Sequence, residues 1–226
     1  MAPTVSDGQT EQSLLVSYLT LRRIVGGLGI GLPIVLVVVG LIFDGQWLSS
    51  ISAYYDLDRP RDIFVGTLVA IGFFLLTYRG YELADDIAGY LSFVFALGVA
   101  LLDHDGSLGT FHFISAAGLF LTFAFYSYFL FTKTSGDVTP EKLTRNRAYR
   151  ICAVVIVGCL LVIAGHGLYA KLSHQDPKGW PAVFWLESLM LWAFGFSWMV
   201  KGETLWRDAG LPPRLKPAET RVPGAR

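Results

Sequence analysis

The side chains that could do chemistry in this chain are a few histidine, carboxyl and hydroxyl groups near the ends of long apolar stretches. The predicted ligand-binding residues are Ser50, Ser52, Asp62, His112, His166 and Glu187. Histidine exchanges protons near neutral pH, while hydroxyl and carboxyl groups supply hydrogen-bond donors and acceptors. These residue types predict a pocket that binds a polar group or assists proton transfer. The sequence identifies none of them as catalytic.

Glu187 is the most informative of these residues, because it lies inside the apolar stretch 184–190. A carboxyl group within a membrane is costly unless it is protonated, paired, or bound to a metal or ligand. The predicted partners are His112, His166, Arg59 and Arg61. A second interpretation stays open, in which Glu187 makes a fixed hydrogen bond to a neighbouring helix or to the first loop.

Two histidines and a carboxylate also form a common zinc ligand set. His112, His166 and Glu187 are the predicted ligands, and a zinc-bound water would serve a metal-dependent lipid hydrolase. No H-E-x-x-H or H-x-x-x-H spacing accompanies these residues. A nucleophilic serine would be Ser50 or Ser52, and neither lies in a G-x-S-x-G setting. Zinc is therefore the one cofactor that the pattern suggests.

The elements that position these residues are predicted to be membrane helices. The 226 residues are 53% hydrophobic and 16% charged, against roughly a quarter charged in soluble domains. Six continuously apolar stretches approach the roughly 20 residues that a helix needs to cross a membrane. They cover residues 24–43, 62–78, 84–102, 110–132, 150–172 and 181–200. The predicted fold is all-α, a polytopic membrane protein with six transmembrane helices.

The basic residues are distributed unequally between the two sides of this predicted bundle. Of 18 Lys and Arg, 14 fall on the side of the termini and of the second and fourth loops; the other four are Arg59, Arg61, Lys171 and Lys178. The positive-inside rule then predicts both termini in the cytoplasm. The expected location of the bundle is the cell inner (plasma) membrane. Residues 1–23 form a cytoplasmic segment, 24–200 the bundle, and 201–226 a cytoplasmic, basic, proline-rich tail. All four histidines fall on the outer side.

Several classes of protein are disfavoured by what the sequence lacks. The formal net charge of zero gives no bias toward nucleic acid. No predicted span contains a central lysine or repeated arginines, and no P-loop is present. Retinal binding, voltage sensing and nucleotide-driven transport are therefore unsupported. The expected partners are membrane lipid and a membrane protein, which includes a second copy of the chain.

The stretch Ser50–Tyr54, followed by Pro60, resembles the serine-containing signature of the Frag/DRAM/Sfk superfamily of six-helix membrane proteins. Ala88-Gly89, Leu97-Gly98, His112 and Glu187 follow in the superfamily's order. The resemblance implies six helices and a relation to autophagy modulators and GPI-anchor lipid-remodelling proteins. The strings at 61–66 and 198–203 are similar to uncharacterised bacterial membrane proteins, which would be closer relatives. Alkaline ceramidases and adiponectin-type receptors offer an analogy of chemistry, although the chain lacks their H-x-x-x-H pair.

Two functions follow as leading hypotheses. In the first, an outward-facing polar pocket binds or modifies a lipid headgroup, and Glu187 and the histidines hold the ligand or exchange protons. In the second, the protein is a non-enzymatic scaffold or accessory subunit, and the outer polar groups fasten the first loop to the bundle. A metal-dependent lipid hydrolase is a third hypothesis.

Overall fold

The computed structural model describes residues 5–78, 83–133, 139–176 and 179–206. Helix makes up 83% of the structure, and no strand occurs among these residues. The long helices are α1 (Val5–Phe43), α2 (Asp58–Thr77), α3 (Leu83–Leu101), α4 (Gly109–Phe125), α5 (Pro140–Leu172) and α6 (Ala182–Lys201). Three short helices lie between them: η1 (Ser52–Asp56), η2 (Gly106–Leu108) and the π-helix η3 (Tyr126–Leu130).

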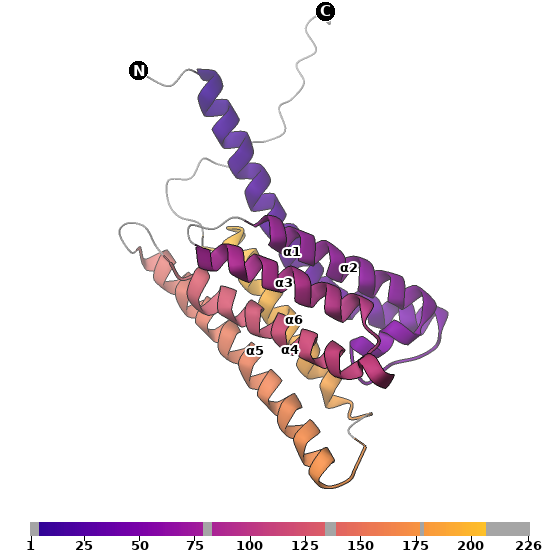
Figure 1. Cartoon of the computed structure of the whole chain (residues 1–226). Helices are drawn as coiled ribbons and strands as arrows, with labels where there is room; N and C mark the ends of the chain where they lie inside the picture. The colour runs from indigo at the N-terminus through magenta and orange to yellow at the C-terminus, as the bar shows by residue number, and fades with distance from the viewer. Residues whose placement is uncertain (1–4, 79–82, 134–138, 177–178, 207–226) are drawn as a thin grey trace, which may run out of the picture.

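The six long helices form a ring in which each packs against the next along the chain and α6 packs back against α1 (Figure 1). The start of α1 and the end of α6 lie at one end of the bundle. The connections α1–α2, α3–α4 and α5–α6 lie at the opposite end, which we call the first-loop end after residues 44–57. Helices α4 and α5 lie together near the termini and separate toward the first-loop end.

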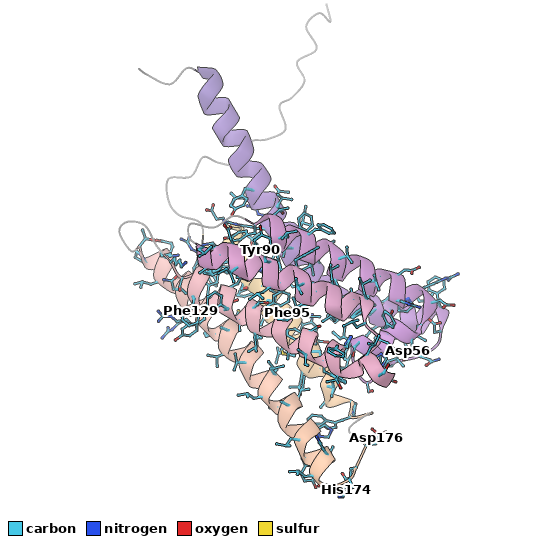
Figure 2. The ribbon with its side chains drawn as sticks, in the orientation of Figure 1. Asp56, Tyr90, Phe95, Phe129, His174 and Asp176 are labelled. Atoms are coloured by element: carbon cyan, nitrogen blue, oxygen red, sulfur yellow. The ribbon has the colours of Figure 1, made fainter. Side chains whose placement is uncertain are left out.

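The surface of the bundle is apolar around its sides, which is the reverse of a soluble protein. Ile42, Val94 and Leu161 are each 60% exposed or more, and Figure 2 shows Tyr90 and Phe129 on the flanks of the bundle. The interior is filled by fully buried side chains such as Phe194. In the part of the chain that the structure describes, six helical segments are long and apolar enough to cross a membrane.

The predicted spans agree with these six segments, and the main differences lie at helix ends. The first helix begins at Val5 rather than near residue 24, because polar residues continue a helix that hydropathy alone cannot follow. The fourth predicted span is α-helical only to Phe125 and then continues as η3. Residues 207–226, most of the predicted basic tail, lie outside the described residues.

Helix α5 begins ten residues before the predicted span 150–172, and its first turn shows a local cause. Pro140 is the first helical residue, and the Thr139 hydroxyl accepts a hydrogen bond from the Lys142 N–H at 3.2 Å. Proline suits this position, and a threonine cap satisfies a backbone donor that the helix leaves unpaired. The resulting helix of 33 residues is longer than the roughly 20 residues that a membrane requires.

The start of the first apolar segment is fastened to the end of the last one by two hydrogen bonds. Arg22 Nη1 donates to the carbonyl oxygen of Lys201 at 3.2 Å, and Arg23 Nε donates to that of Gly202 at 2.8 Å. Both arginines belong to α1 and both carbonyls lie at the end of α6. Both of these segments therefore meet at one end of the bundle.

Candidate functional site

The first loop folds onto the end of the bundle and is held there by its own buried residues. Ser52 and Tyr54 of η1 are buried. The Tyr54 ring packs so closely on Gly40 that a Cβ there would lie 2.8 Å from the ring. The Tyr54 hydroxyl accepts a hydrogen bond from the Leu48 N–H at 3.3 Å. Burial raises the pKa of Tyr54, and the Leu48 hydrogen bond opposes part of that shift.

Glu187 fastens this loop to the first turns of α6. Its Oε2 accepts a hydrogen bond from the Ile51 N–H at 2.6 Å. One helical turn earlier, the Phe184 N–H donates to the carbonyl oxygen of Ser49 at 2.8 Å. The loop and the helix are thus joined by two hydrogen bonds, one to the Glu187 side chain and one between backbone groups.

The prediction that Arg59 and Arg61 pair with Glu187 is wrong. Arg59 lies over the Phe43 ring at 3.9 Å from its centroid. Arg61 lies over the Tyr55 ring and donates to the Tyr55 hydroxyl at 2.9 Å. Neither histidine replaces them, because the described contacts of His112 and His166 do not include Glu187. The observed partner is loop backbone, as the second interpretation proposed.

A cavity of about 660 Å³ lies beside this loop, between α4, α5 and α6. Its polar wall consists of Ser49, Ser50, Ser52, His104, Asp105, Thr110, His166 and Glu187. Its apolar wall includes Phe113, Ala117, Phe120, Ile163, Val183 and Met190. The polar groups come from the first-loop end, while the apolar residues continue along the helices into the bundle. The cavity is therefore amphipathic along its length.

The rim of the cavity is apolar where α4 and α5 separate. Phe113 and Ile114 of α4 line the cavity and are 61% and 57% exposed. Ala164 of α5 lines the cavity from the other side and is also exposed. Residues that line a cavity and are exposed at the same time mark its opening. This opening faces the apolar flank of the bundle.

Four of the six predicted ligand-binding residues line this cavity, namely Ser50, Ser52, His166 and Glu187. The buried Nε2 atom of His166 has no hydrogen-bond partner. The His166 ring packs on that of Trp180, with 4.1 Å between the centroids. Trp180 also lines the cavity. An unpartnered ring nitrogen beside a cavity is available to a ligand, since a buried polar group is normally hydrogen-bonded.

The other two predicted residues lie elsewhere. His112 is buried and its Nδ1 lies 3.0 Å from the carbonyl oxygen of Leu102. Together with Ser52 and Glu187, His112 lines a separate space of only about 40 Å³. Asp62 is exposed on α2 and is not part of the cavity wall. His112 thus lies next to Ser52 and Glu187 without lining the main cavity, whereas Asp62 does not belong to the site.

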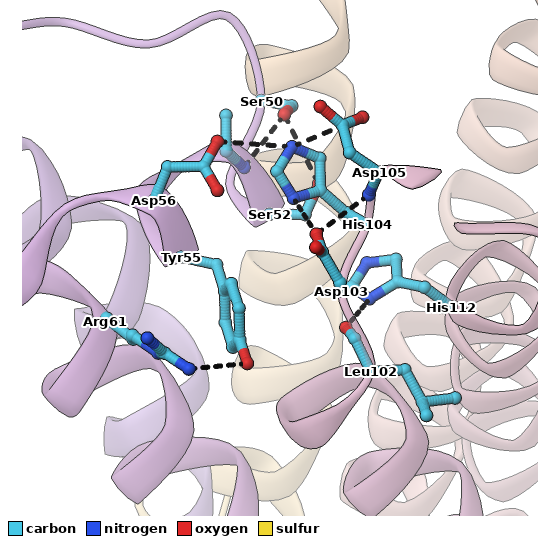
Figure 3. Close-up of polar contacts among 11 residues, drawn as sticks. Ser50, Ser52, Tyr55, Asp56, Arg61, Leu102, Asp103, His104, Asp105 and His112 are labelled. Carbon is cyan, nitrogen blue, oxygen red and sulfur yellow. Dashed lines mark hydrogen bonds and ion pairs between the residues drawn. The ribbon is translucent and has the colours of Figure 1, made fainter. Parts of the chain in front are cut away.

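His104 and Asp105 line the cavity but were not predicted as ligand-binding residues. His104 lies among three carboxylates, at 3.6 Å from Asp56, 3.7 Å from Asp103 and 3.9 Å from Asp105 (Figure 3). Its side chain is only 12% exposed. Asp103 also accepts a hydrogen bond from the Asp105 N–H at 3.0 Å. The Asp-His-Asp string at 103–105 was a usable signal, because two carboxylates next to a histidine balance its positive charge.

The predicted zinc ligands are not the residues that the structure gathers. Among the described residues, the group whose ligand atoms all lie within 4.8 Å of one another is Asp56, Asp103 and His104. It contains none of His112, His166 and Glu187. Both aspartates in it are exposed, whereas hydrolytic zinc sites are held in shaped cavities with an open position. Zinc and the metal-dependent hydrolase stay predictions.

The two serines are held by the loop rather than by a base. Ser50 Oγ lies 3.3 Å from Ser52 Oγ and accepts a hydrogen bond from the Ala53 N–H at 3.1 Å. Neither hydroxyl bonds to a histidine among the contacts of the described residues. Activation of a serine nucleophile requires a base within hydrogen-bond distance. The arrangement is that of hydroxyl groups which stabilise a loop and face a cavity.

Comparison with known proteins gives no further guide to the site. No protein-family model matches the chain, and neither a curated protein nor a solved structure matches it. The resemblance to the Frag/DRAM/Sfk superfamily stays a prediction. What the structure defines is an all-helical bundle with six potential membrane spans and an amphipathic cavity at its first-loop end.

Proposed function

We propose that this protein is an integral membrane protein whose cavity binds a membrane lipid, with the lipid headgroup at the first-loop end. The observation that carries the proposal is the amphipathic cavity with its apolar lateral opening. Polar groups from the loops surround one end, and Phe113, Phe120 and Met190 line the rest. Ligand sites are typically apolar with a few polar groups that fix orientation. A lipid has this distribution of polar and apolar surface.

The dimensions of the cavity suit part of a lipid. A volume of about 660 Å³ lies within the roughly 300–1,000 Å³ of small-molecule sites. It holds a headgroup and the first part of an acyl chain, and the opening between α4 and α5 lets the rest of the chain extend into the membrane. A lateral opening also allows a lipid to enter without crossing water.

The proposal includes an orientation in which both termini are cytoplasmic and the first-loop end faces outward. The Lys and Arg count supports this orientation, as 14 of 18 lie on the side of the termini. The structure places the two ends of the described chain on one side, which is consistent with that count. The headgroup site would then lie in the outer leaflet of the cell inner membrane.

The test is a cavity-filling substitution with a matched control on the same helix. Ala117→Phe places an aromatic ring in the cavity, whereas Leu121→Phe changes a residue that is 50% exposed and outside the cavity wall. Lipid that stays with the purified protein after delipidation is quantified by mass spectrometry. We expect Ala117→Phe to retain less than about a tenth of the lipid that the wild type and Leu121→Phe retain. Equal retention by all three would refute the lipid-binding proposal.

A scaffold or accessory subunit is the second candidate, and the Glu187–Ile51 hydrogen bond favours it. In that case the buried loop residues and Glu187 serve only to fix the first loop as a docking surface. Glu187→Gln would then lower thermal stability in detergent, and Glu187→Ala more so, while retained lipid is unchanged in both variants. Cellular lipid composition would also be unaffected by deletion of the protein, by His112→Ala or by Glu187→Ala.

A further inference from the structure

The charges that line the cavity are one-sided. Asp105 and Glu187 are its acidic residues, and no lysine or arginine occurs among its described lining residues. Both histidines of the wall have defined surroundings. His104 has three carboxylates within 3.9 Å, so a positive charge on its ring is already balanced. His166 packs on Trp180 and its unpartnered Nε2 faces no charged neighbour among the described contacts.

The excess of acidic over basic residues extends from the cavity wall over the surrounding surface of the first-loop end. The described carboxyl groups of the first-loop end are Asp44, Asp56, Asp58, Asp62, Asp103, Asp105, Asp176 and Glu187, eight in all, against the three cations Arg59, Arg61 and Lys171. Both arginines lie over aromatic rings of Phe43 and Tyr55, away from the cavity wall. Figure 3 shows Asp56, Asp103 and Asp105 directed at His104 beside the first loop.

A ligand charge enters a low-dielectric cavity only if the wall compensates it. A phosphate without an attached cation would bring negative charge beside Asp105 and Glu187, and no lining lysine or arginine is present to neutralise it. An ammonium group would instead be attracted to both carboxylates. The aromatic wall of Phe113, Phe120 and Trp180 adds ring faces that also stabilise a cation.

We infer that the lipid bound in this cavity carries an ammonium group in its headgroup, which lies between Glu187 and Asp105. The inference rests on the proposed lipid-binding function and specifies its ligand class. His166 Nε2 then hydrogen-bonds a neutral oxygen of the headgroup or its linkage. Ammonium groups occur both in zwitterionic phospholipids and in long-chain amines that have no phosphate, and the experiment separates these sources.

The experiment measures the affinity of the full-length protein in detergent for three lipids by native mass spectrometry. Phosphatidylethanolamine carries ammonium and phosphate, octadecylamine carries ammonium alone, and phosphatidylglycerol carries phosphate alone. We expect both amine-bearing lipids to bind about tenfold more tightly than phosphatidylglycerol. If phosphatidylglycerol binds as tightly, or if octadecylamine does not bind, the ammonium inference is overturned while lipid binding stands. If none of the three binds, the proposed function itself fails.

Three acid-to-amide variants test where the preference arises. Glu187→Gln keeps an oxygen that accepts the Ile51 N–H, and Asp105→Asn keeps the size of its side chain, so both remove charge with little change of shape. Each is expected to reduce the preference for amine-bearing lipids at least threefold. Asp58→Asn is the matched control, because Asp58 is exposed at the same end and is not a lining residue. Unchanged preferences in Glu187→Gln and Asp105→Asn would overturn the inference.

Discussion

At the scale of single residues, the position of the first loop beside the cavity depends on hydrogen bonds to two partly or fully buried polar side chains. Glu187 hydrogen-bonds loop backbone, and Tyr54 accepts a backbone N–H inside the fold. The type and depth of Glu187 were enough to identify it from sequence, because an intramembrane carboxyl group requires a partner. Its partner was not predictable, because every residue except proline has a backbone N–H and the sequence does not show which one Glu187 meets. Pairs of side chains can be guessed from residue types, but side-chain-to-backbone bonds cannot.

Tyr54 gives a prediction about pH. Its folded-state pKa lies above its unfolded value because burial disfavours the phenolate. The folded protein therefore keeps this proton in a range where the unfolded chain has lost it, so stability is intact below pH about 10 and declines above it. Tyr54→Phe should lose about 1 kcal/mol at neutral pH, because the Leu48 N–H loses its acceptor. Above pH about 10, the stability of the Tyr54→Phe variant should decline less steeply than that of the wild type.

The measurement is unfolding in detergent of wild type and Tyr54→Phe between neutral and alkaline pH. Burial raises the pKa of Tyr78 as well, so part of the alkaline decline remains in the variant. The decisive quantity is the difference in stability between the two proteins at each pH. This difference should shrink as the pH rises above about 10. A constant difference would show that the Tyr54 phenol titrates alike in the folded and unfolded chain.

At the scale of elements, apolar length predicted all six helices, and what it could not predict was how they pair. Where helices of the bundle approach closely, particular glycines face backbone or ring atoms of the neighbouring helix. At the crossing of α1 and α6, a Cβ on Gly26 would lie 2.7 Å from the Gly195 oxygen, and a Cβ on Gly195 would lie 2.5 Å from the Gly26 oxygen. Small residues permit such approach where lipid supplies no hydrophobic drive. The sequence shows many glycines within the apolar stretches, but it does not show which of them meet.

This crossing gives a prediction for Gly195, with a control at Gly27, the residue next to Gly26 on α1. Gly195→Ala should destabilise the protein by about 2 kcal/mol, because the added methyl group meets backbone that cannot move without separating the helices. Gly27→Ala should not destabilise the protein and is expected to stabilise it by up to about 1 kcal/mol, since nothing lies within 4 Å of a Cβ there and alanine is the better helix former. Reversible unfolding in detergent measures both. Equal effects of the two substitutions would mean that α1 and α6 do not cross at Gly26 and Gly195.

The same reasoning explains which part of the candidate site was missed. Asp62 was included because it lies at the mouth of a predicted span, but the face of α2 on which it lies is exposed. His104 falls between the predicted spans 84–102 and 110–132, yet in the structure it lies 3.6 Å from Asp56 of η1 and lines the cavity. Depth along the membrane can be estimated from sequence, whereas rotation about a helix axis and loop position depend on packing. Four of the six predicted residues line one cavity, because residues at the same depth along the bundle already lie at the same end of it.

At the scale of the whole molecule, the remaining question is which end faces the cytoplasm, because the proposed headgroup site changes leaflet with the answer. The first-loop end is acidic, and the end with the termini is basic. The first-loop end has eight described carboxyl groups and three cations, while most lysines and arginines of the chain belong to the side of the termini. A bundle with this asymmetry is expected to insert with its basic end in the cytoplasm.

Labelling of single cysteines decides the orientation. Both native cysteines, Cys152 and Cys159, are buried in α5, and alanine at both positions gives the background. Ser107→Cys places a thiol on an exposed residue at the first-loop end, and Thr144→Cys does so near the termini. In intact cells a membrane-impermeant maleimide should label Ser107→Cys, and it should label Thr144→Cys only after permeabilisation. The reverse pattern would place the cavity in the cytoplasmic leaflet and overturn the proposed orientation, while the cavity-wall charges on which the ammonium inference rests would be unchanged.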